Sequence, residues 1–189
     1  MQTIIQTPTN KLEDSLSFYK KLNFTLLSEE QTTILSDGQA ILEINSDRFA
    51  RAGVKLLKPS WTVEVNQLKK ITSVIEIDNG FLLSDPSGAW IYLIEAANVV
   101  VYDLSKITPS VLGTFAGLSL ESTAIDLSYK IWETLGFKKT MGSIENGWVA
   151  LQHENKSGVS LMKPNSCPHL FFNPSLTYFN GKENLAIIE

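Results

Sequence analysis

Several kinds of residue are scarce in this 189-residue sequence, and each scarcity excludes a class of protein. The single cysteine, Cys167, rules out an intrachain disulfide and is typical of a reducing cytoplasm. Two histidines limit the metal and acid–base chemistry available. No apolar run reaches the ~18 residues of a transmembrane helix, and no basic start followed by an apolar stretch indicates a secretory signal. We therefore expect a cytoplasmic protein that does not contact a membrane.

The charge balance also argues against one kind of partner. Sixteen basic residues stand against twenty acidic ones, which gives a net charge of −4, and no basic run interrupts this pattern. Nucleic acid is therefore not an expected partner. The remaining composition, 43% hydrophobic and 19% charged, is that of an ordinary globular protein of one or two domains.

The sequence repeats itself. LEDSLSFYKKLNF (12–24) matches IDLSYKIWETLGF (125–137) at an offset of 113 residues, and PSWTVEVN (59–66) matches PSLTYFNG (174–181) at an offset of 115. Two matches in the same order predict a duplicated unit. We expect a first domain over 1–96, a linker over 97–112 and a second domain over 113–189 that lacks its closing strands.

The first pair of matching segments predicts two equivalent helices. Asn10 and Glu13 form a candidate capping box before the first helix. Asn23 and Gly136 suit the left-handed position that ends a helix, and each is followed by phenylalanine, which can pack back on the last turn. The apolar faces of these helices predict a set of buried side chains: Phe18, Leu22, Phe24, Ile131, Leu135 and Phe137.

Short β-prone runs follow each helix. TIIQT precedes the first helix, and runs such as AILEI and AWIYLIE flank the turn signals Asp37-Gly38 and Asp85-Pro86-Ser87-Gly88. The order predicts βαβββ units at about 1–47 and 58–96, with helices near 11–22 and 66–72 and a strand at SWTVEV. The expected fold class is α+β: tandem βαβββ modules that form cupped mixed sheets, duplicated into two domains with the second incomplete.

Paired βαβββ units, SLSFYKKLNF after the first strand and the ending DPSGAWIYLIE resemble the vicinal oxygen chelate superfamily. This superfamily includes glyoxalase I, extradiol dioxygenases and bleomycin-resistance proteins. The resemblance covers 1–96 well and 113–189 more weakly. It implies a cupped sheet in which metal-dependent members place ligands, usually His or Gln and Glu, on four strands.

The metal positions implied by the resemblance are poorly filled in this chain. The first falls on Ile4, or on Gln2 or Gln6 if the alignment slips, and Glu43 fills the second. Ser60 or Trp61 takes the third, and Tyr92 stands where glutamate is expected. The second copy offers Gly117, Leu161 and Leu176. A catalytic metal usually has three protein ligands, so we expect no metal cofactor, with a divalent ion as the alternative.

Several other polar and aromatic residues are candidates for a functional site. Glu43 is the candidate catalytic residue, as a general base or hydrogen-bond acceptor, and Trp61, Trp90 and Tyr92 are candidate ligand-binding residues. His153 with Glu154 suggests an acid–base pair and Cys167 with His169 a nucleophile pair, but a solvated strand end and a loop explain them better. No GxGxxG, P-loop, HExxH or GxSxG motif occurs.

These residues leave three functions open. The first is a metal-free, small-molecule-binding protein similar to bleomycin-resistance proteins. The second is a metal-dependent lyase, isomerase or dioxygenase of the same superfamily, and the third is a structural module whose cup holds its own side chains. Because the second copy lacks the counterparts of about 22 residues of the first, we also expect a sheet edge that pairs with a second chain in a homodimer.

Overall fold

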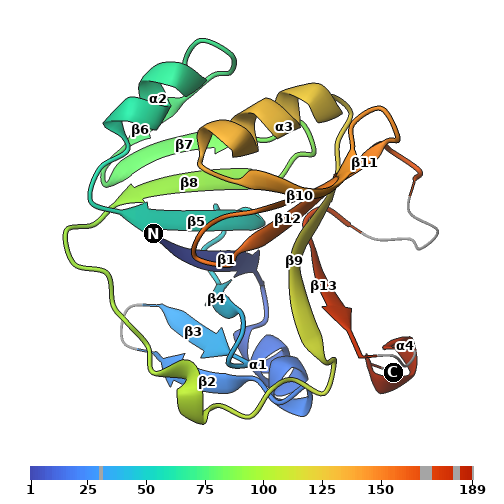
Figure 1. Cartoon of the computed structure of the whole chain (residues 1–189). Helices are drawn as coiled ribbons and strands as arrows, with labels where there is room; N and C mark the ends of the chain where they lie inside the picture. The colour runs from blue at the N-terminus through green and yellow to red at the C-terminus, as the bar shows by residue number, and fades with distance from the viewer. Residues whose placement is uncertain (30–31, 167–171, 181–183, 189) are drawn as a thin grey trace.

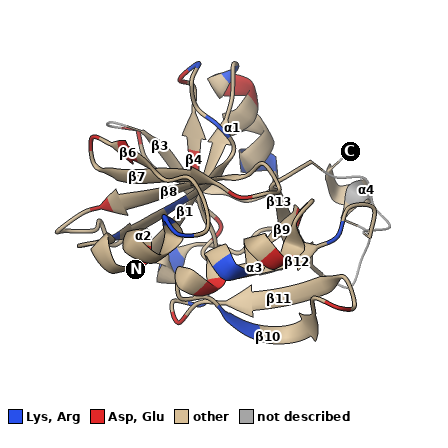
Figure 2. Ribbon diagram, turned by 90° about the horizontal axis from the view of Figure 1, so that it is seen from above, with Lys and Arg blue, Asp and Glu red and all other residues tan. Residues whose placement is uncertain are grey.

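A computed structural model describes residues 1–29, 32–166, 172–180 and 184–188 of the chain. Cys167 and His169, the candidate nucleophile pair of the sequence, lie outside these ranges. The described residues form two mixed sheets with few helices, which confirms the predicted α+β class (Figure 1). No helix among them is both long enough and apolar enough to cross a membrane. Basic and acidic residues are interspersed over the molecule (Figure 2).

The first sheet has eight strands in the order β2-β3-β4-β1-β5-β8-β7-β6. It consists of two βαβββ modules, which meet where β1 and β5 pair antiparallel. Within each module the first and last strands pair in parallel, β1 with β4 and β5 with β8. The elements are β1 (Gln2–Pro8), α1 (Leu12–Lys21), β2 (Thr25–Ser28), β3 (Thr33–Ser36), β4 (Ile41–Asn45), β5 (Gly53–Lys58), α2 (Thr62–Leu68), β6 (Ile75–Ile77), β7 (Gly80–Ser84) and β8 (Trp90–Glu95).

The second sheet has five strands in the order β10-β11-β12-β9-β13. It holds a third βαβββ module, and β13 pairs antiparallel with β9 as β5 pairs with β1. A linker that includes the short helix η1 (Leu104–Lys106) joins β8 to this sheet. The other elements are β9 (Thr114–Glu121), α3 (Ile125–Thr134), β10 (Lys138–Ser143), β11 (Trp148–Gln152), β12 (Gly158–Met162), β13 (Ser175–Phe179) and α4 (Leu185–Ile188).

Helices α1 and α3 end as the sequence predicts. Asn23 (φ 65°) and Gly136 (φ 93°) adopt the left-handed conformation. Phe24 N donates to the Tyr19 carbonyl, and Phe137 N donates to the Trp132 carbonyl, each at 3.0 Å. The start of α1 differs from the prediction, because the hydroxyl of Thr9 rather than Asn10 accepts from the Lys11 amide. The two helices are therefore equivalent elements, 113 residues apart as the repeat indicates.

The prediction of a strand at SWTVEV and a helix at 66–72 is wrong. Residues Thr62–Leu68 form α2, and the first strand of the second module is β5, which lies earlier, at Gly53–Lys58. Apolar residues at 61, 63 and 65 fit a strand, but 61, 65 and 68 fit a helix equally well. Trp61, Val65 and Leu68 are buried whereas Val63 is 67% exposed, so the helical spacing describes the fold. The second repeat match thus relates a helix to the strand β13 and is coincidental.

The helices cover one face of the sheets and enclose the hydrophobic core. Leu22, Phe24, Ile131, Leu135 and Phe137 are all at most 5% exposed, as predicted. Phe18 is 41% exposed, so its predicted burial is wrong. Its ring packs edge-to-face on Tyr19, and Tyr19 in turn packs on Phe24. Phe18 therefore lies at the rim of the core, separated from Phe24 by the Tyr19 ring.

This difference between neighbouring phenylalanines gives a matched test of the core. We expect Phe24→Ala to lower the free energy of unfolding by about 3–5 kcal/mol, because a buried ring is removed and a cavity remains. Phe18→Ala should cost about 1 kcal/mol or less, since much of that ring already faces water. Urea unfolding of both variants measures the difference. Equal losses would mean that the two rings are not buried as described.

Two buried aspartates of the first sheet's turns form hydrogen bonds with α3 and with β13 of the second sheet. Asp85, in the turn before β8, accepts from Ser128 Oγ (3.0 Å) and from Trp132 Nε1 (3.1 Å), both on α3. Asp37, in the turn before β4, accepts from the Tyr178 hydroxyl of β13 at 2.8 Å. Burial raises the pKa of Asp85, although its hydrogen bonds oppose the shift. Burial and the nearby Asp37 carboxylate raise the pKa of Tyr178. Both turns thus connect the sheets as well as reversing the chain.

Candidate functional site

Strand register brings four polar residues onto the face of the first sheet opposite the helices. Gln6 of β1 pairs with Glu43 of β4, and Lys55 of β5 pairs with Tyr92 of β8. Gln6 and Lys55 are 49 positions apart, as are Glu43 and Tyr92, so they occupy equivalent places in the two modules. We call Gln6, Glu43, Lys55 and Tyr92 the four-residue row. It lies on the first and last strands of each module, and three of these strands, β1, β4 and β8, are those on which the family resemblance places ligands.

This register decides which residue stands at each predicted position. Gln6, and not Ile4, is the equivalent of Lys55, because Gln6 pairs with Glu43 as Lys55 pairs with Tyr92. Ile4 lies two residues away on the same face of β1, where it pairs with Lys55. Ser60 and Trp61 are not at the third position, because they lie beyond β5. Lys55 takes that place. Sequence reasoning missed Lys55 because a lysine in a strand ordinarily faces solvent.

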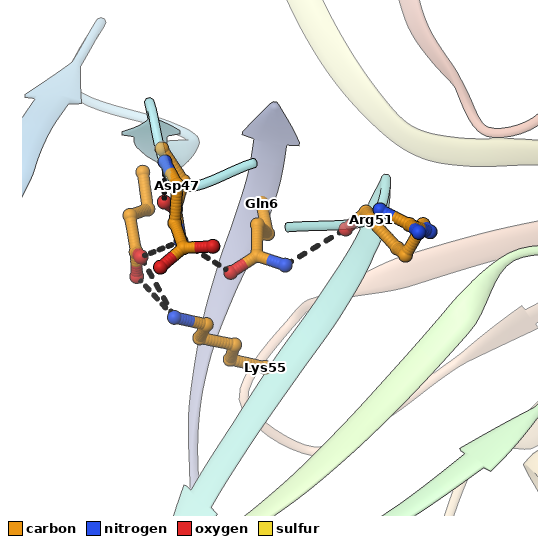
Figure 3. Close-up of polar contacts among 6 residues, drawn as sticks. Gln6, Asp47, Arg51 and Lys55 are labelled. Atoms are coloured by element: carbon orange, nitrogen blue, oxygen red, sulfur yellow. Dashed lines mark hydrogen bonds and ion pairs between the residues drawn. The ribbon is translucent and has the colours of Figure 1, made fainter. Parts of the chain in front are cut away.

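An ion pair dominates the four-residue row. The ammonium nitrogen of Lys55 lies 2.7 Å from both carboxylate oxygens of Glu43, and it reaches across β1 to do so (Figure 3). The Glu43 side chain is only 4% exposed and that of Lys55 is 20% exposed. The carboxylate is thus withdrawn from water and held by a charge-assisted, bidentate contact.

The rest of the row is fixed by amide hydrogen bonds. Asn45 Nδ2 donates to both Gln6 Oε1 and Glu43 Oε1, each at 3.1 Å. Gln6 Nε2 donates to the Arg51 carbonyl at 2.7 Å (Figure 3). These contacts orient Gln6, and they give Glu43 Oε1 a second hydrogen-bond donor besides the Lys55 ammonium. No buried polar side-chain atom in the described residues lacks a hydrogen-bond partner.

The three aromatic candidates do not all share this face. Tyr92 and Trp90, two residues apart on β8, are half-buried on it, and the Lys55 ammonium lies 5.8 Å from the centre of the Tyr92 ring. Trp61 is 1% exposed in the hydrophobic core. Its indole Nε1 donates to the Ile94 carbonyl, and its ring lies under the Lys58 ammonium. The structure therefore places Trp90 and Tyr92 on the same face of the sheet as Glu43 and leaves Trp61 elsewhere.

The four-residue row does not fit a divalent metal ion. The ammonium of Lys55 contacts both carboxylate oxygens of Glu43, so a metal ion would have to displace this ammonium before it could bind them. Tyr92 offers a phenol where a carboxylate is expected. Among the described residues, no three His, Cys, Asp or Glu side chains gather as metal ligands would. The arrangement instead provides hydrogen-bond donors and an aromatic wall.

The equivalent positions of the second sheet carry hydroxyl groups. Ser160 of β12 pairs with Ser119 of β9, and Thr177 of β13 pairs with Gly117. Ser119 and Thr177 are hydrogen-bonded through their hydroxyls at 2.6 Å. The predicted Gly117 lies two residues from Ser119, and the predicted Leu161 lies one residue from Ser160. Leu176, predicted near the third position, is the neighbour of Thr177. The second sheet thus has no carboxylate among these positions.

His153 and Glu154 do not form an acid–base pair. Glu154 is 80% exposed and contacts Lys138 at 3.3 Å. The His153 ring packs against Phe137, and its Nδ1 lies 3.1 Å from the side-chain oxygen of Asn155. Burial lowers the pKa of His153, and the charges of the N-terminal amine and of Lys58 act in the same direction. This histidine fixes the β11–β12 turn against α3.

Known structures share this arrangement of modules. No protein-family model matches the sequence, and no curated protein matches it. Among solved structures, a Mn(II)-bound glyoxalase from Novosphingobium aromaticivorans is 13% identical with a TM-score of 0.53, over 92% of this chain and 62% of that one. The 2,3-dioxygenase LapB from Pseudomonas sp. KL28 is 13% identical with a TM-score of 0.53, over 84% and 68%.

A catechol 2,3-dioxygenase is also similar, at 9% identity and a TM-score of 0.52, over 84% of this chain and 65% of that one. A xylose isomerase-like/4-hydroxyphenylpyruvate dioxygenase fusion protein gives a TM-score of 0.54 at 11% identity, with 85% and 31% covered. This chain thus spans about a third to two thirds of the length of these proteins. The likeness shows that this chain shares the fold of these glyoxalase and dioxygenase structures, as the sequence resemblance implied.

Proposed function

We propose that this chain binds a small molecule on the face that carries the four-residue row and that it does so without a catalytic metal. The observation that carries the proposal is the ion pair between Lys55 and Glu43. It places a permanent positive charge, which belongs to the chain itself, on the carboxylate that a metal would use. In this respect the chain is closer to a metal-free binding protein than to a metal-dependent enzyme on the same fold.

The groups left over on this face indicate the chemistry of the ligand. A lysine ammonium has three N–H donors, and Glu43 takes two of them. In the described part of the chain, neither the third donor nor the Tyr92 hydroxyl has a partner. Trp90 and Tyr92 add half-buried rings beside these donors. A flat or aromatic molecule with an oxygen acceptor matches this combination.

A second candidate is a metal-dependent lyase, isomerase or dioxygenase. One observation favours it: Gln6 and Glu43 lie side by side with their oxygens bridged by Asn45, and both oxygens are types that bind divalent ions. Activity would then require Lys55 to leave Glu43. This requirement makes the two candidates separable by direct metal measurement.

Elemental analysis distinguishes the two candidates. Protein produced in medium supplemented with manganese, zinc, nickel and iron should retain far less than one metal ion per chain after desalting, because the Lys55 charge opposes binding. Stoichiometric metal that is lost in a Glu43→Ala variant would contradict the proposal and establish the second candidate.

A ligand screen tests the binding itself. Aromatic carboxylates and phenols are compared by the rise they cause in the melting temperature, which follows ligand affinity. Compounds that stabilise the protein should lose this effect in Tyr92→Ala and keep it in Tyr129→Ala, a matched change on α3. Stabilisation that survives Tyr92→Ala would place the ligand elsewhere.

A further inference from the structure

A cavity of about 510 Å³ lies between the two sheets, away from the four-residue row. Strands β1 and β5 line it from the first sheet, β9 and β12 line it from the second, and residues of the linker close one side. Figure 1 shows this linker, in green, running from β8 past β2 and β3 to β9. A volume of this size matches that of small-molecule sites. Neither Glu43, Lys55, Trp90 nor Tyr92 contributes to its wall.

The wall of the cavity is mostly apolar. Phe115, Leu118, Trp132 and Phe137 contribute from the second sheet and α3, and Ile5 and Val54 face them from the first sheet. Trp132 and Phe137 are each 1% exposed and pack edge-to-face on each other, so this end of the cavity is formed by closely packed rings. It offers an aromatic and aliphatic surface to the body of a ligand.

The charges at the cavity are of one sign. Lys58 and Lys156 are the charged side chains among its lining residues, and no aspartate or glutamate lines it. Lys58 shares its charge with Glu64 at 2.6 Å. Lys156 is exposed and forms no ion pair with the described residues. An anion bound in the cavity beside Lys156 would therefore meet an ammonium group that no carboxylate of the described residues neutralises.

Hydrogen bonds bring both lysines to the same end of the cavity. Asn155 Nδ2 donates to Thr3 Oγ1 at 3.0 Å, and Ser157 Oγ contacts the same oxygen at 2.8 Å. The β11–β12 turn that carries Lys156 is thereby held beside the start of β1. Lys58 ends β5 next to this point, because Leu57 pairs with Gln2. The polar end and the apolar end of the cavity are thus distinct.

The linker covers the cavity as a tethered strap. Gln2 Nε2 donates to the carbonyl of Val100 at 2.9 Å and holds the linker against β1. Val99 is half-buried and lines the cavity, whereas Val100 is 63% exposed and does not. These neighbouring valines therefore provide a matched pair of positions, one inside and one outside.

We propose that this cavity is a second ligand site, which takes an anionic amphiphile: an apolar or aromatic body with one carboxylate or sulfonate group. The body lies against Trp132, Phe137 and Phe115, and the anion lies near Lys156 and Lys58. This site does not depend on the proposed function of the four-residue row.

Two fluorescent probes test the proposal: 8-anilinonaphthalene-1-sulfonate, which is anionic, and N-phenyl-1-naphthylamine, which is neutral. Each is excited directly and titrated with the intact chain. Val99→Trp, which fills the cavity, should abolish saturable binding of both probes, whereas Val100→Trp should preserve it. Lys156→Glu should weaken the anionic probe by about tenfold or more and leave the neutral probe within about twofold. Lys130→Glu, an equal charge change on the exposed surface of α3, should change neither.

Other outcomes overturn the second site. Absence of saturable binding of the anionic probe to the unmodified chain would do so, as would equal affinities of Val99→Trp and the unmodified chain. Equal weakening of both probes by Lys156→Glu would remove the role of charge. If Tyr92→Ala abolishes probe binding and Val99→Trp does not, the second site is wrong while the proposed function of the four-residue row stands. Circular dichroism of each variant verifies that it is folded.

Discussion

Replacing Lys55 with methionine should lower the free energy of unfolding by about 3–5 kcal/mol at neutral pH, because the buried Glu43 carboxylate is left without its charge partner. Glu43→Gln should also destabilise, since it leaves the ammonium unpaired. The double variant Lys55→Met/Glu43→Gln should recover much of the loss, because it removes both charges together. Urea unfolding of the four proteins gives the coupling energy directly.

An exposed ion pair on the same chain provides the control. Lys138 and Glu154 lie 3.3 Å apart, but their side chains are 76% and 80% exposed. Lys138→Met should therefore change stability very little. If the losses from Lys55→Met and Glu43→Gln simply added in the double variant, the two side chains would not be interacting as the geometry states.

The double variant Lys55→His/Tyr92→Glu should gain divalent-metal binding. It removes the ammonium from Glu43 and completes a row of glutamine, glutamate, histidine and glutamate, which exceeds the three protein ligands of an ordinary catalytic site. We expect nickel or manganese to bind at least about 100-fold more tightly than to the unmodified chain. Isothermal titration calorimetry measures the affinity.

The same substitutions in a Glu43→Ala background serve as the control for this gain. Metal binding should then fall back, because one oxygen ligand of the row is lost. Binding that persists without Glu43 would arise from the new side chains alone, and the row would not converge on one point. Unchanged weak binding in the double variant would show that the four positions lie too far apart to share an ion.

Much of the fold could be predicted because local signals agreed. Asn23 and Gly136 end their helices where left-handed residues are required, and the following phenylalanines are buried. The position of α2 could not be derived in this way, because Trp61 and Val65 fit both the strand and the helix period. Only the exposure of Val63 separates the two, and it depends on tertiary packing.

The candidate site was predictable in half of its members. Glu43 and Tyr92 follow from the runs AILEI and AWIYLIE and their place in the chain. The choice between Ile4 and Gln6 required the register of β1 against β4, because both side chains lie on the same face of β1 and only the register shows which of them stands beside Glu43. The partnership of Lys55 with Glu43 joins strands separated by β1, and no short-range pattern contains it.

The two buried aspartates make the folding of the sheets interdependent. If α3 were separated from the first sheet, Ser128 and Trp132 would lose the Asp85 carboxylate, and Tyr178 would likewise lose Asp37 if β13 were separated. Each separation breaks a buried hydrogen bond, and the aspartate and its donor then lose a partner for which they were positioned. Local opening of the third module alone should therefore be costly. We expect hydrogen exchange of backbone amides in β9 and β12 to require the same global unfolding as exchange in β1 and β5. We therefore expect the chain to unfold as one cooperative unit rather than as two independently melting halves.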